Sequence, residues 1–344
     1  MPSKPRIALD AAGGDVGVKV NVPAAVAAAK AGIPVTLVGD EAALKPELDA
    51  LGAWRLGLEI AQASQIVGMH EKPSEALRRK KDSSIQVACS LVKAGRAAGV
   101  VSAGNSGATV GCGIFTLGRI NGVERPALAS LMPTEKKPTV LIDVGANVDS
   151  KPYHLVQFGI MADVFVRDVL GVARPTVGLL SIGEEEGKGN AVVKEAYDLF
   201  KKTPLNFIGN VEGRDIFTGD VHIVVCDGFV GNVALKLAEG LGKSFGKVLK
   251  GELKRGLISK IGTVLSRRAL VRFSRVLDYA EYGGAPLLGL KSIAVVCHGA
   301  SNVKAITNAI KMAATFAEKK AHEHLARELE AHSEIARFGR QSKT

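Results

Sequence analysis

Short apolar runs alternate with helix-like patterns along most of the chain. The pattern predicts a strand over residues 6–9, a turn over 10–15, a helix over 20–31 and a second strand over 35–38. Further helical patterns follow at 41–51, 74–79, 84–94, 106–117, 153–170, 190–201, 232–250 and 301–320. Because this alternation is typical of parallel sheets covered on both faces, we predict a three-layer α/β/α fold with a mostly parallel sheet.

Five of the apolar runs end in short loops of Gly, Asn, Ser and Asp that lead into a helix. These loops occupy residues 104–107, 145–147, 183–190, 228–232 and 299–302. In a parallel sheet such loops leave the carboxyl ends of strands, where glycine lets a ligand approach the backbone and helix N-termini attract anions. We therefore expect one anion-binding crevice.

A basic segment interrupts the alternation, since no strand is expected between about 232 and 290. Residues 243–275 contain ten Lys and Arg against Glu252, a local charge of +9 within a total of +11. The apolar residues of this segment share helical faces, so we predict a basic amphipathic helical insertion at about 245–282. It protrudes from a single α/β unit of one or two lobes at 1–336, and a loose basic tail follows at 337–344.

Two interpretations of the insertion remain open. It is an ordinary helix pair for core or dimer packing with a solvated basic face, or an arm that rests on anionic lipid. In the second case the membrane-contact residues are Leu257, Ile258, Ile261, Val264 and Leu265.

Composition narrows the class of protein. The 344 residues are 47% hydrophobic, enough for a large core, and we expect neither a signal peptide nor a transmembrane segment. The four cysteines are widely spaced in apolar surroundings, which fits a reducing cytoplasm. The seven histidines form no metal-binding motif, so no metal site is expected.

Lys188 is the most distinctive candidate for chemistry, since it lies between two glycines directly before a helical pattern. That arrangement presents a flexible positive charge and free backbone N–H groups to one anion. The alternative is an exposed turn lysine balanced by Glu184, Glu185 and Glu186. A dinucleotide-binding glycine motif is missing, and the segment 239–244 only resembles a phosphate-binding loop.

Other polar residues at the loops have two uses. Asn105 and Asn232 either cap their helices or donate an amide to a developing oxyanion, and capping is the more frequent use. Cys226 and His298 end different strands and offer a minor acyl-cysteine route if they meet across strands.

Seven short motifs connect these loops to a known family. They lie, in order over nearly the whole chain, at 9–15, 81–84, 102–108, 143–147, 183–190, 227–232 and 298–302. On these residues the chain resembles the bacterial phosphate acyltransferases of phospholipid synthesis, which transfer a fatty acyl group from acyl carrier protein to inorganic phosphate. One departure is visible, because Ala12 stands where the family commonly has Met.

The resemblance implies a fold similar to isopropylmalate dehydrogenases and phosphotransacetylases, a homodimer and no organic cofactor. It also implies a cytoplasmic protein peripherally associated with the inner face of the cell membrane, which favours the lipid-contacting arm. The acidic carrier protein is a second partner for the same basic segment, which then serves lipid, carrier protein or both. In the hypothetical mechanism phosphate attacks the thioester directly, with Lys188 and Asn232 as catalytic residues. The residues expected to shape the substrate and phosphate crevice are Asp10, Gly13, Gly14, Asp15, Asn105, Ser106, Asp143, Asn147, Gly189, Asn190, Asp227, Gly228, His298, Ser301 and Asn302.

Three other functions stay open. A phosphotransacetylase-like enzyme would use acyl-coenzyme A. A nucleic-acid-binding protein fits the sequence pI of about 9.5, but aromatic residues total only 5% and leave few stacking platforms, so no nucleic-acid partner is expected. A membrane scaffold would have no need for the glycine-rich loops.

Overall fold

The innermost strands of the protein are apolar on both faces, as buried parallel strands require. Every residue is buried in β1 (Ile7–Asp10), β2 (Val35–Gly39), β4 (Gly99–Ser102), β6 (Thr139–Ile142) and β11 (Ile293–Val296), and likewise in β9 (Ile223–Val225). The computed structural model describes residues 4–276 and 278–331. The tail predicted at 337–344 lies outside the described residues.

All the strands join in one 11-stranded sheet, in the order β3-β2-β1-β4-β11-β10-β5-β6-β9-β7-β8. The remaining strands are β3 (Glu59–Gln62), β5 (Ala127–Met132), β7 (Thr176–Leu180), β8 (Asn206–Val211) and β10 (Ala285–Leu288). β10 falls where the sequence predicted no strand. Pro286 lies inside it, and because proline lacks an N–H group it weakens any strand pattern read from sequence.

The sheet consists of two parallel sets joined by β10 and β5. The first set runs from β3 to β11 and the second from β6 to β8, while β10 and β5 are antiparallel to each neighbour. Three reversals separate the sets, so they run in opposite directions. Val296, the last residue of β11, pairs with Ala285 of β10, and Ile142, the last residue of β6, pairs with Ala129 of β5. The carboxyl ends of β11 and β6 therefore lie at nearly the same height along the joining strands, although the two strands run in opposite directions.

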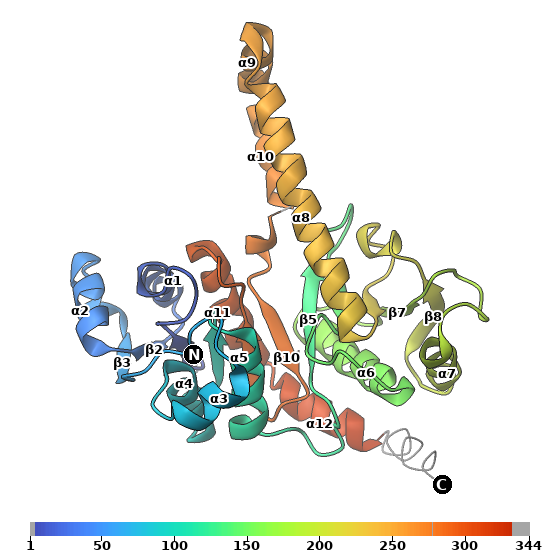
Figure 1. The fold of residues 1–344 in the computed structure, drawn as a ribbon, viewed down its shortest axis with the longest axis horizontal. Coiled ribbons are helices and arrows are strands. Elements are labelled where there is room, and N and C mark those ends of the chain that lie inside the picture. Colours follow the sequence, from blue (N-terminus) through green and yellow to red (C-terminus); the bar gives the residue numbers. More distant parts are fainter. Residues whose placement is uncertain (1–3, 277, 332–344) are drawn as a thin grey trace.

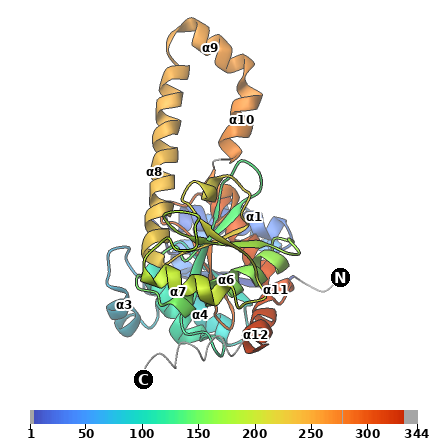
Figure 2. The same ribbon diagram turned by 90° about the vertical axis from the view of Figure 1, so that its right-hand side faces the viewer.

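Helices cover both faces of the sheet (Figures 1 and 2). One core lies under α1 (Val18–Lys30), α6 (Pro152–Asp168), α11 (Val303–Glu318) and α12 (Ala321–Ala331), and it includes Phe158 and Phe165. The opposite core lies under α4 (Ser84–Lys93), α5 (Ser106–Cys112) and the first turns of α8 (Gly228–Leu253). The predicted three-layer arrangement with a mostly parallel sheet is confirmed.

We call the half of the molecule around β3 to β11 the N-terminal lobe and the half around β6 to β8 the second lobe. Shorter elements complete both. They are α2 (Glu41–Ala50), α3 (Pro73–Arg79), α7 (Ala191–Phe200), the 3-10 turns at Trp54–Leu56, Asp215–Phe217 and Tyr279–Glu281, and a π-helical turn at Gly113–Leu117.

A helical arm rises from the body (Figure 1). It consists of the outer part of α8, then α9 (Gly256–Leu265) at the tip and α10 (Arg267–Val276), which returns to the body. Figure 2 shows α8 and α10 as two separate legs joined by α9. Among the described helices, none is both long enough and apolar enough to span a membrane.

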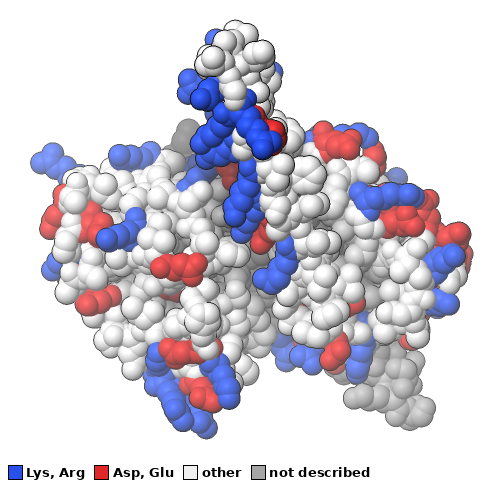
Figure 3. Space-filling model, turned by 45° about the horizontal axis from the view of Figure 1, so that its top comes forward, with Lys and Arg blue, Asp and Glu red and all other residues white. Residues whose placement is uncertain are grey.

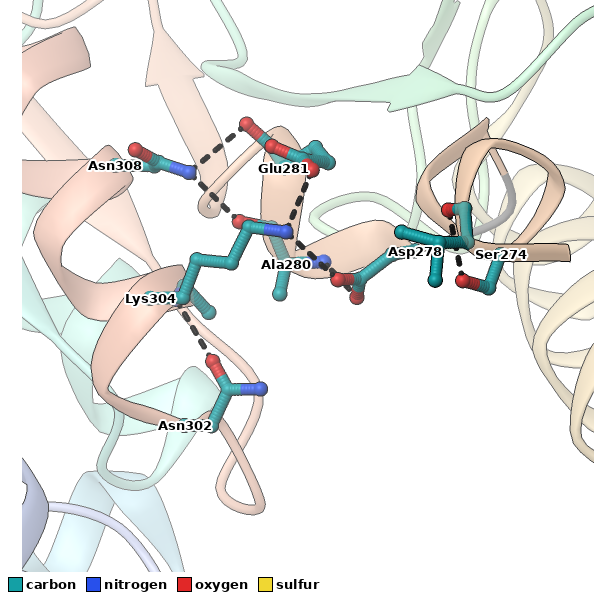
Figure 4. A network of polar contacts seen from close by, with 9 residues as sticks. Ser274, Asp278, Ala280, Glu281, Asn302, Lys304 and Asn308 are labelled. Atoms are coloured by element: carbon teal, nitrogen blue, oxygen red, sulfur yellow. Dashed lines mark hydrogen bonds and ion pairs between the residues drawn. The ribbon is translucent and has the colours of Figure 1, made fainter. Parts of the chain in front are cut away.

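Both legs of the arm are fixed to the body. At the foot of α8, Gly228 and Gly231 pack directly against the loop after β6, which leaves no room for side chains. Beyond α10 the chain is held by α11 (Figure 4): Lys304 Nζ forms ion pairs with Asp278 Oδ2 at 2.9 Å and Glu281 Oε1 at 2.6 Å. Asn308 Nδ2 donates to the carbonyl oxygens of Ala280 and Glu281.

The foot of α8 gives a testable stability difference. A Cβ at position 231 would lie 1.9 Å from the carbonyl oxygen of Asp143, so Gly231→Ala must displace the helix or the loop. We expect it to lower the free energy of unfolding by roughly 1–3 kcal/mol, as overpacking does. The measurement is urea denaturation followed by circular dichroism.

Gly240→Ala is the matched control in the same helix. Nothing lies within 4 Å of a Cβ at position 240, so helix propensity alone should raise the free energy of unfolding, by up to about 1 kcal/mol. Equal effects of the two substitutions would contradict the close packing at Gly231.

Candidate functional site

The loop after β1 is built around a buried carboxylate. Asp10 Oδ1 accepts a hydrogen bond from the Gly13 N–H at 3.1 Å, and Oδ2 accepts one from the Ser102 hydroxyl at 2.7 Å. Burial raises the pKa of Asp10, and hydrogen bonds from Ser84 and Ser102 act in the opposite direction. With its oxygens used inside the protein, Asp10 shapes the loop and has no free face for an anion.

Close backbone approach joins the loops after β1, β4 and β11. A Cβ at Gly13 would lie 2.6 Å from Asp10 Oδ2 and 2.8 Å from the Gly104 nitrogen, so only glycine fits. Gly14 has a φ of 96°, a conformation that side chains disfavour. The Asp15 N–H donates to the Gly299 carbonyl at 2.9 Å. These loops form the first group of predicted site residues.

Four of the predicted site residues cap helices. The side-chain oxygens of Asn105, Asn190, Asp227 and Asn302 each accept a hydrogen bond from the backbone N–H three residues later. The Asn105 amide nitrogen also donates to three carbonyl oxygens, those of Gly68, Met69 and Glu71. Both of its amide protons are therefore used, and of the two roles open to Asn105 the structure favours capping.

Other residues of the first group differ in exposure. Ser106 is exposed at the start of α5. His298 is exposed too, and its Nδ1 accepts from the Ala300 N–H at 3.1 Å. Ser301 is buried, and its hydroxyl has no hydrogen-bond partner within the described part of the chain.

A second buried carboxylate organises the loop after β6. Asp143 accepts from the backbone N–H groups of Leu128, Gly145, Ala146 and Asn147 and from the Asn147 amide, at 2.7–3.1 Å. Burial raises its pKa and these hydrogen bonds oppose the rise. Asn147 also donates to the Pro126 carbonyl, so both residues hold the loop in place.

Lys188 lies exposed in the loop after β7, just before α7. Two of its three acidic neighbours are paired elsewhere, Glu184 with Arg214 at 3.1 Å and Glu186 with Lys201 at 2.9 Å. Glu185 forms no ion pair with Lys188 among the described residues. Within residues 4–276 and 278–331 no acidic group pairs with Lys188. Its ammonium is therefore free for an external anion.

The residue after Lys188 is a glycine packed closely against the body. Gly189 has a φ of 101°, and a Cβ there would meet Val193 at 2.6 Å and the Ser181 hydroxyl at 3.0 Å. That hydroxyl is buried and has no hydrogen-bond partner among the described residues. It lies below the first turn of α7, which Asn190 caps.

Asn232 is half-buried in the second turn of α8 and faces Gly145. Its Cβ and Cγ would lie 3.4 Å from a Cβ at Gly145. Its amide forms no hydrogen bond to any described residue, in contrast to Asn105. The amide is thus available to a substrate.

Strand order brings Lys188 and Asn232 into neighbouring loops. β9 pairs in parallel with β7 on one side and with β6 on the other, and Val225 lies opposite both Leu179 and Ile142. The carboxyl ends of these three strands are therefore adjacent, roughly 5 Å apart from strand to strand. Asp143, Asp227, Gly228, Asn232 and Lys188 all follow them and form the second group.

The structure thus divides the predicted site residues into two groups instead of one row. The five loops do not all leave one edge of the sheet, because the two strand sets run in opposite directions. The single anion-binding crevice expected from the sequence stays a prediction. The three antiparallel pairings made by β10 and β5 carry no distinctive signal in the sequence. A ligand that touched both groups would have to lie over these joining strands.

The structure argues against the acyl-cysteine route, because Cys226 and His298 do not meet across strands. Cys226 follows β9 and His298 follows β11. Three strands lie between β9 and β11, so four inter-strand spacings of about 4.8 Å, roughly 19 Å in all, separate the two strands. Burial raises the pKa of Cys226 well above its ordinary value and that of Cys297 to about 12, so both stay protonated thiols near neutral pH. They belong to the core.

Sequence reasoning missed Asn21, a buried residue of α1 whose amide donates to the carbonyls of Ala11 at 3.0 Å and Gly13 at 2.8 Å. It fixes the first loop. The signal was a lone Asn in an otherwise apolar helix. The described residues contain no group of three His, Cys, Asp or Glu that could hold a metal ion.

Comparison with known proteins assigns the chain to a family. The profile of the fatty acid synthesis protein family matches residues 5–324. A phosphate acyltransferase from Nitratidesulfovibrio vulgaris strain DP4 is 62% identical over 336 residues, 97% of each chain. Another, from Oleidesulfovibrio alaskensis, is 60% identical over 343 residues, 99% of each chain.

Solved structures agree on the fold. A phosphotransacetylase from Streptococcus pyogenes has a TM-score of 0.63 at 16% identity and covers 92% of this chain and 95% of its own. One from Staphylococcus aureus has a TM-score of 0.62 at 18% identity, with 91% and 94% covered. The phosphotransacetylase-like fold is confirmed, and the sequence identities show that the chain belongs to the phosphate acyltransferase family.

Proposed function

We propose that this acyltransferase moves a fatty acyl group from acyl-acyl carrier protein to inorganic phosphate and so makes an acyl-phosphate for phospholipid synthesis. The observation that carries the proposal is the free Lys188 ammonium and the unbonded Asn232 amide on segments that follow the neighbouring strands β7 and β9. A cation and a neutral donor at one end of the same strands suit an anionic nucleophile that attacks a carbonyl.

In the proposed reaction a phosphate oxygen attacks the thioester carbonyl carbon. The new C–O bond forms, the carbonyl oxygen becomes an oxyanion, and the C–S bond then breaks as the carbonyl reforms. The pantetheine thiolate leaves and takes a proton from solvent. Since thiols have a pKa near about 8.5, no strong general acid is required.

Lys188 and the N–H groups at the start of α7 are assigned to phosphate, with Gly189 allowing close approach. Asn232 is assigned to the oxyanion or to phosphate. Asp10 and Asp143 are assigned to positioning, because their buried carboxylates already accept hydrogen bonds and would repel phosphate.

Replacement of Lys188 tests the assignment. We expect Lys188→Ala to lower kcat by roughly 10²–10³-fold, the usual loss when one stabilising donor is removed. The measurement is phosphate-dependent release of carrier thiol from a long-chain acyl-acyl carrier protein, with acyl-coenzyme A as the competing donor.

Lys194→Ala is the control, at an exposed lysine on α7, the helix that follows the Lys188 loop, and it should keep full activity. Near-normal turnover of Lys188→Ala would end the assignment. Faster turnover of acyl-coenzyme A than of the carrier thioester by the wild type would favour the phosphotransacetylase-like alternative.

We further propose that the tip of the arm contacts the inner face of the cell membrane, which makes the protein cytoplasmic but peripherally membrane-associated. All five predicted contact residues are exposed on α9, with Ile258 88% and Leu265 81% exposed. Figure 3 supports this with a mostly uncharged tip above a shaft rich in Lys and Arg. Such an end suits shallow insertion beside anionic head groups.

The Ile258→Glu, Leu265→Glu double variant should lower binding to anionic phospholipid vesicles at least tenfold, because charge would enter the apolar layer. Cosedimentation measures it, and activity in detergent-free solution should persist. Leu51→Glu, an equally drastic change of an exposed apolar residue on the body, should leave binding unchanged. Undiminished binding of the tip variant would contradict the proposal.

The homodimer is proposed to form along α8. One face of this helix carries a continuous exposed apolar stripe: Phe229, Val230, Val233, Leu237, Leu241, Phe245, Val248 and Leu249. The stripe begins at the body, beyond the reach of lipid at the tip, and α10 stands apart from α8 (Figure 2). A second copy can cover it, since two such helices bury their stripes against one another.

Leu237→Glu with Leu241→Glu should convert the dimer to monomer at micromolar concentration, because four charges would meet in the seam. Sedimentation velocity measures the change. Lys247→Glu, on another face of α8, should leave the dimer intact. A dimer that survives the double substitution would place the interface elsewhere.

A further inference from the structure

The short helix α3 presents a cationic surface that the reaction proposed above does not use. Lys72, Arg78, Arg79 and Lys81, here called the α3 patch, are all exposed, and the Lys72 side chain is 80% exposed. Figure 3 shows Lys and Arg gathered at the lower edge of the N-terminal lobe, where Figure 1 places α3.

Little of this positive charge is neutralised within the protein. Lys72 has a loose contact with Glu75 at 3.8 Å, and Lys81 Nζ donates only to the Leu77 carbonyl. Within the described part of the chain Arg78 and Arg79 pair with no acidic side chain. Of the other nearby acids, Glu71 is paired with Lys80 and Asp82 accepts hydrogen bonds from Ser64. Two adjacent guanidinium groups are thus free for a partner.

The α3 patch is held firmly against the first group of site loops. Lys80 Nζ donates to the Ile66 carbonyl at 2.7 Å, and Gln86 of α4 donates to the carbonyls of Leu77 and Lys80. The segment 64–72, which leads into α3, is held by hydrogen bonds from the Asn105 amide to three of its carbonyl oxygens. Because both ends of α3 are fixed, the cations are presented in a set arrangement, which lowers the entropy lost on binding.

An apolar shoulder adjoins the α3 patch. Ile66 is 54% and Met69 37% exposed in the segment 64–72, and the Met69 methyl would lie 2.7 Å from a Cβ at Gly299. Charged and apolar surface therefore meet at the edge of the site loops. Figures 1 and 2 place α3 on the same side of the sheet as the foot of α8, which carries Asn232.

We propose that the α3 patch is the docking surface of the acidic carrier protein that delivers the acyl thioester. This inference rests on the proposed function. An acidic protein gains association rate from fixed, unpaired cations, and its flexible thioester arm can then cross the apolar shoulder toward the second group of loops.

The arm is the other cationic surface, and its geometry favours a different partner. Its Lys and Arg lie next to the apolar tip and suit lipid head groups, whereas the α3 patch has no apolar tip to insert. The α3 patch lies on the body, so a carrier bound there leaves the arm free.

The test is a charge reversal, Arg78→Glu with Arg79→Glu, assayed with two donors. We expect the KM for acyl-acyl carrier protein to rise tenfold or more, with kcat within twofold and a weaker dependence of KM on NaCl. Kinetics with a small acyl-pantetheine thioester should not change. The neutral double variant Arg78→Gln, Arg79→Gln should give an intermediate KM. It serves as a milder substitution in case the charge-reversal variant misfolds.

Two matched reversals serve as controls. Lys30→Glu with Lys311→Glu lies on α1 and α11, across the sheet, and Lys243→Glu with Lys247→Glu lies on the arm. Neither should alter the KM for the carrier substrate. Fluorescence anisotropy of labelled carrier protein should show the same ranking of affinities without turnover.

An unchanged carrier KM and affinity in the Arg78, Arg79 variants would overturn the proposal. So would a rise confined to the arm variant, or a loss of vesicle binding by the α3 variant without any carrier effect. If the wild type releases thiol from neither donor, the proposed function fails instead, and anisotropy still decides whether the carrier docks at the α3 patch.

Discussion

The contact between the first turn of α8 and the backbone after β6 constrains the whole second lobe. A Cβ at Gly231 would lie 1.9 Å from the Asp143 carbonyl oxygen, and one at Gly228 would lie 2.9 Å from Asp143 Oδ2. With no side chains between them, helix and loop meet backbone to backbone. That contact places Asn232 over Gly145 and directs the rest of α8 away from the body.

Buried carboxylates make such loops rigid. Asp143 accepts five hydrogen bonds and Asp10 at least two, so the cost of burying each group is offset by donors that would otherwise lack partners. Asp10 and Asp143 thus fix the shapes of the loops after β1 and β6 by accepting hydrogen bonds from their backbone N–H groups. Lys188, by contrast, forms no ion pair among the described residues, and two of its acidic neighbours, Glu184 and Glu186, bind Arg214 and Lys201.

The sequence predicted the regular parts of the fold well. The helix predicted at 84–94 is α4 (Ser84–Lys93), and the helix at 190–201 is α7 (Ala191–Phe200), because apolar periodicity and Asn or Ser at the start are local signals. β10 was missed since Pro286 obscures it. The opposite directions of the two strand sets depend on the pairing of β10 with β5, which joins Leu287 to Leu128 far along the chain and which no local pattern reports.

The candidate site was only partly predictable. Glycine-rich loops after strands identified most of its residues, but sequence could not distinguish the Asn105 amide, which is fully used, from the Asn232 amide, which is free. Nor could it show which acids neutralise which bases around Lys188. Both distinctions depend on neighbours brought in by tertiary packing.

The arm stands with one foot on each half of the sheet. Its α8 foot is set on the loop after β6, and its other foot, residues 278–281, is tied to Lys304 two residues beyond the cap of α11. Any change in the angle between the lobes must therefore alter the separation of the feet and bend the helices above them. The arm thus links the two lobes mechanically, and binding of a partner at its tip is coupled to the angle between them.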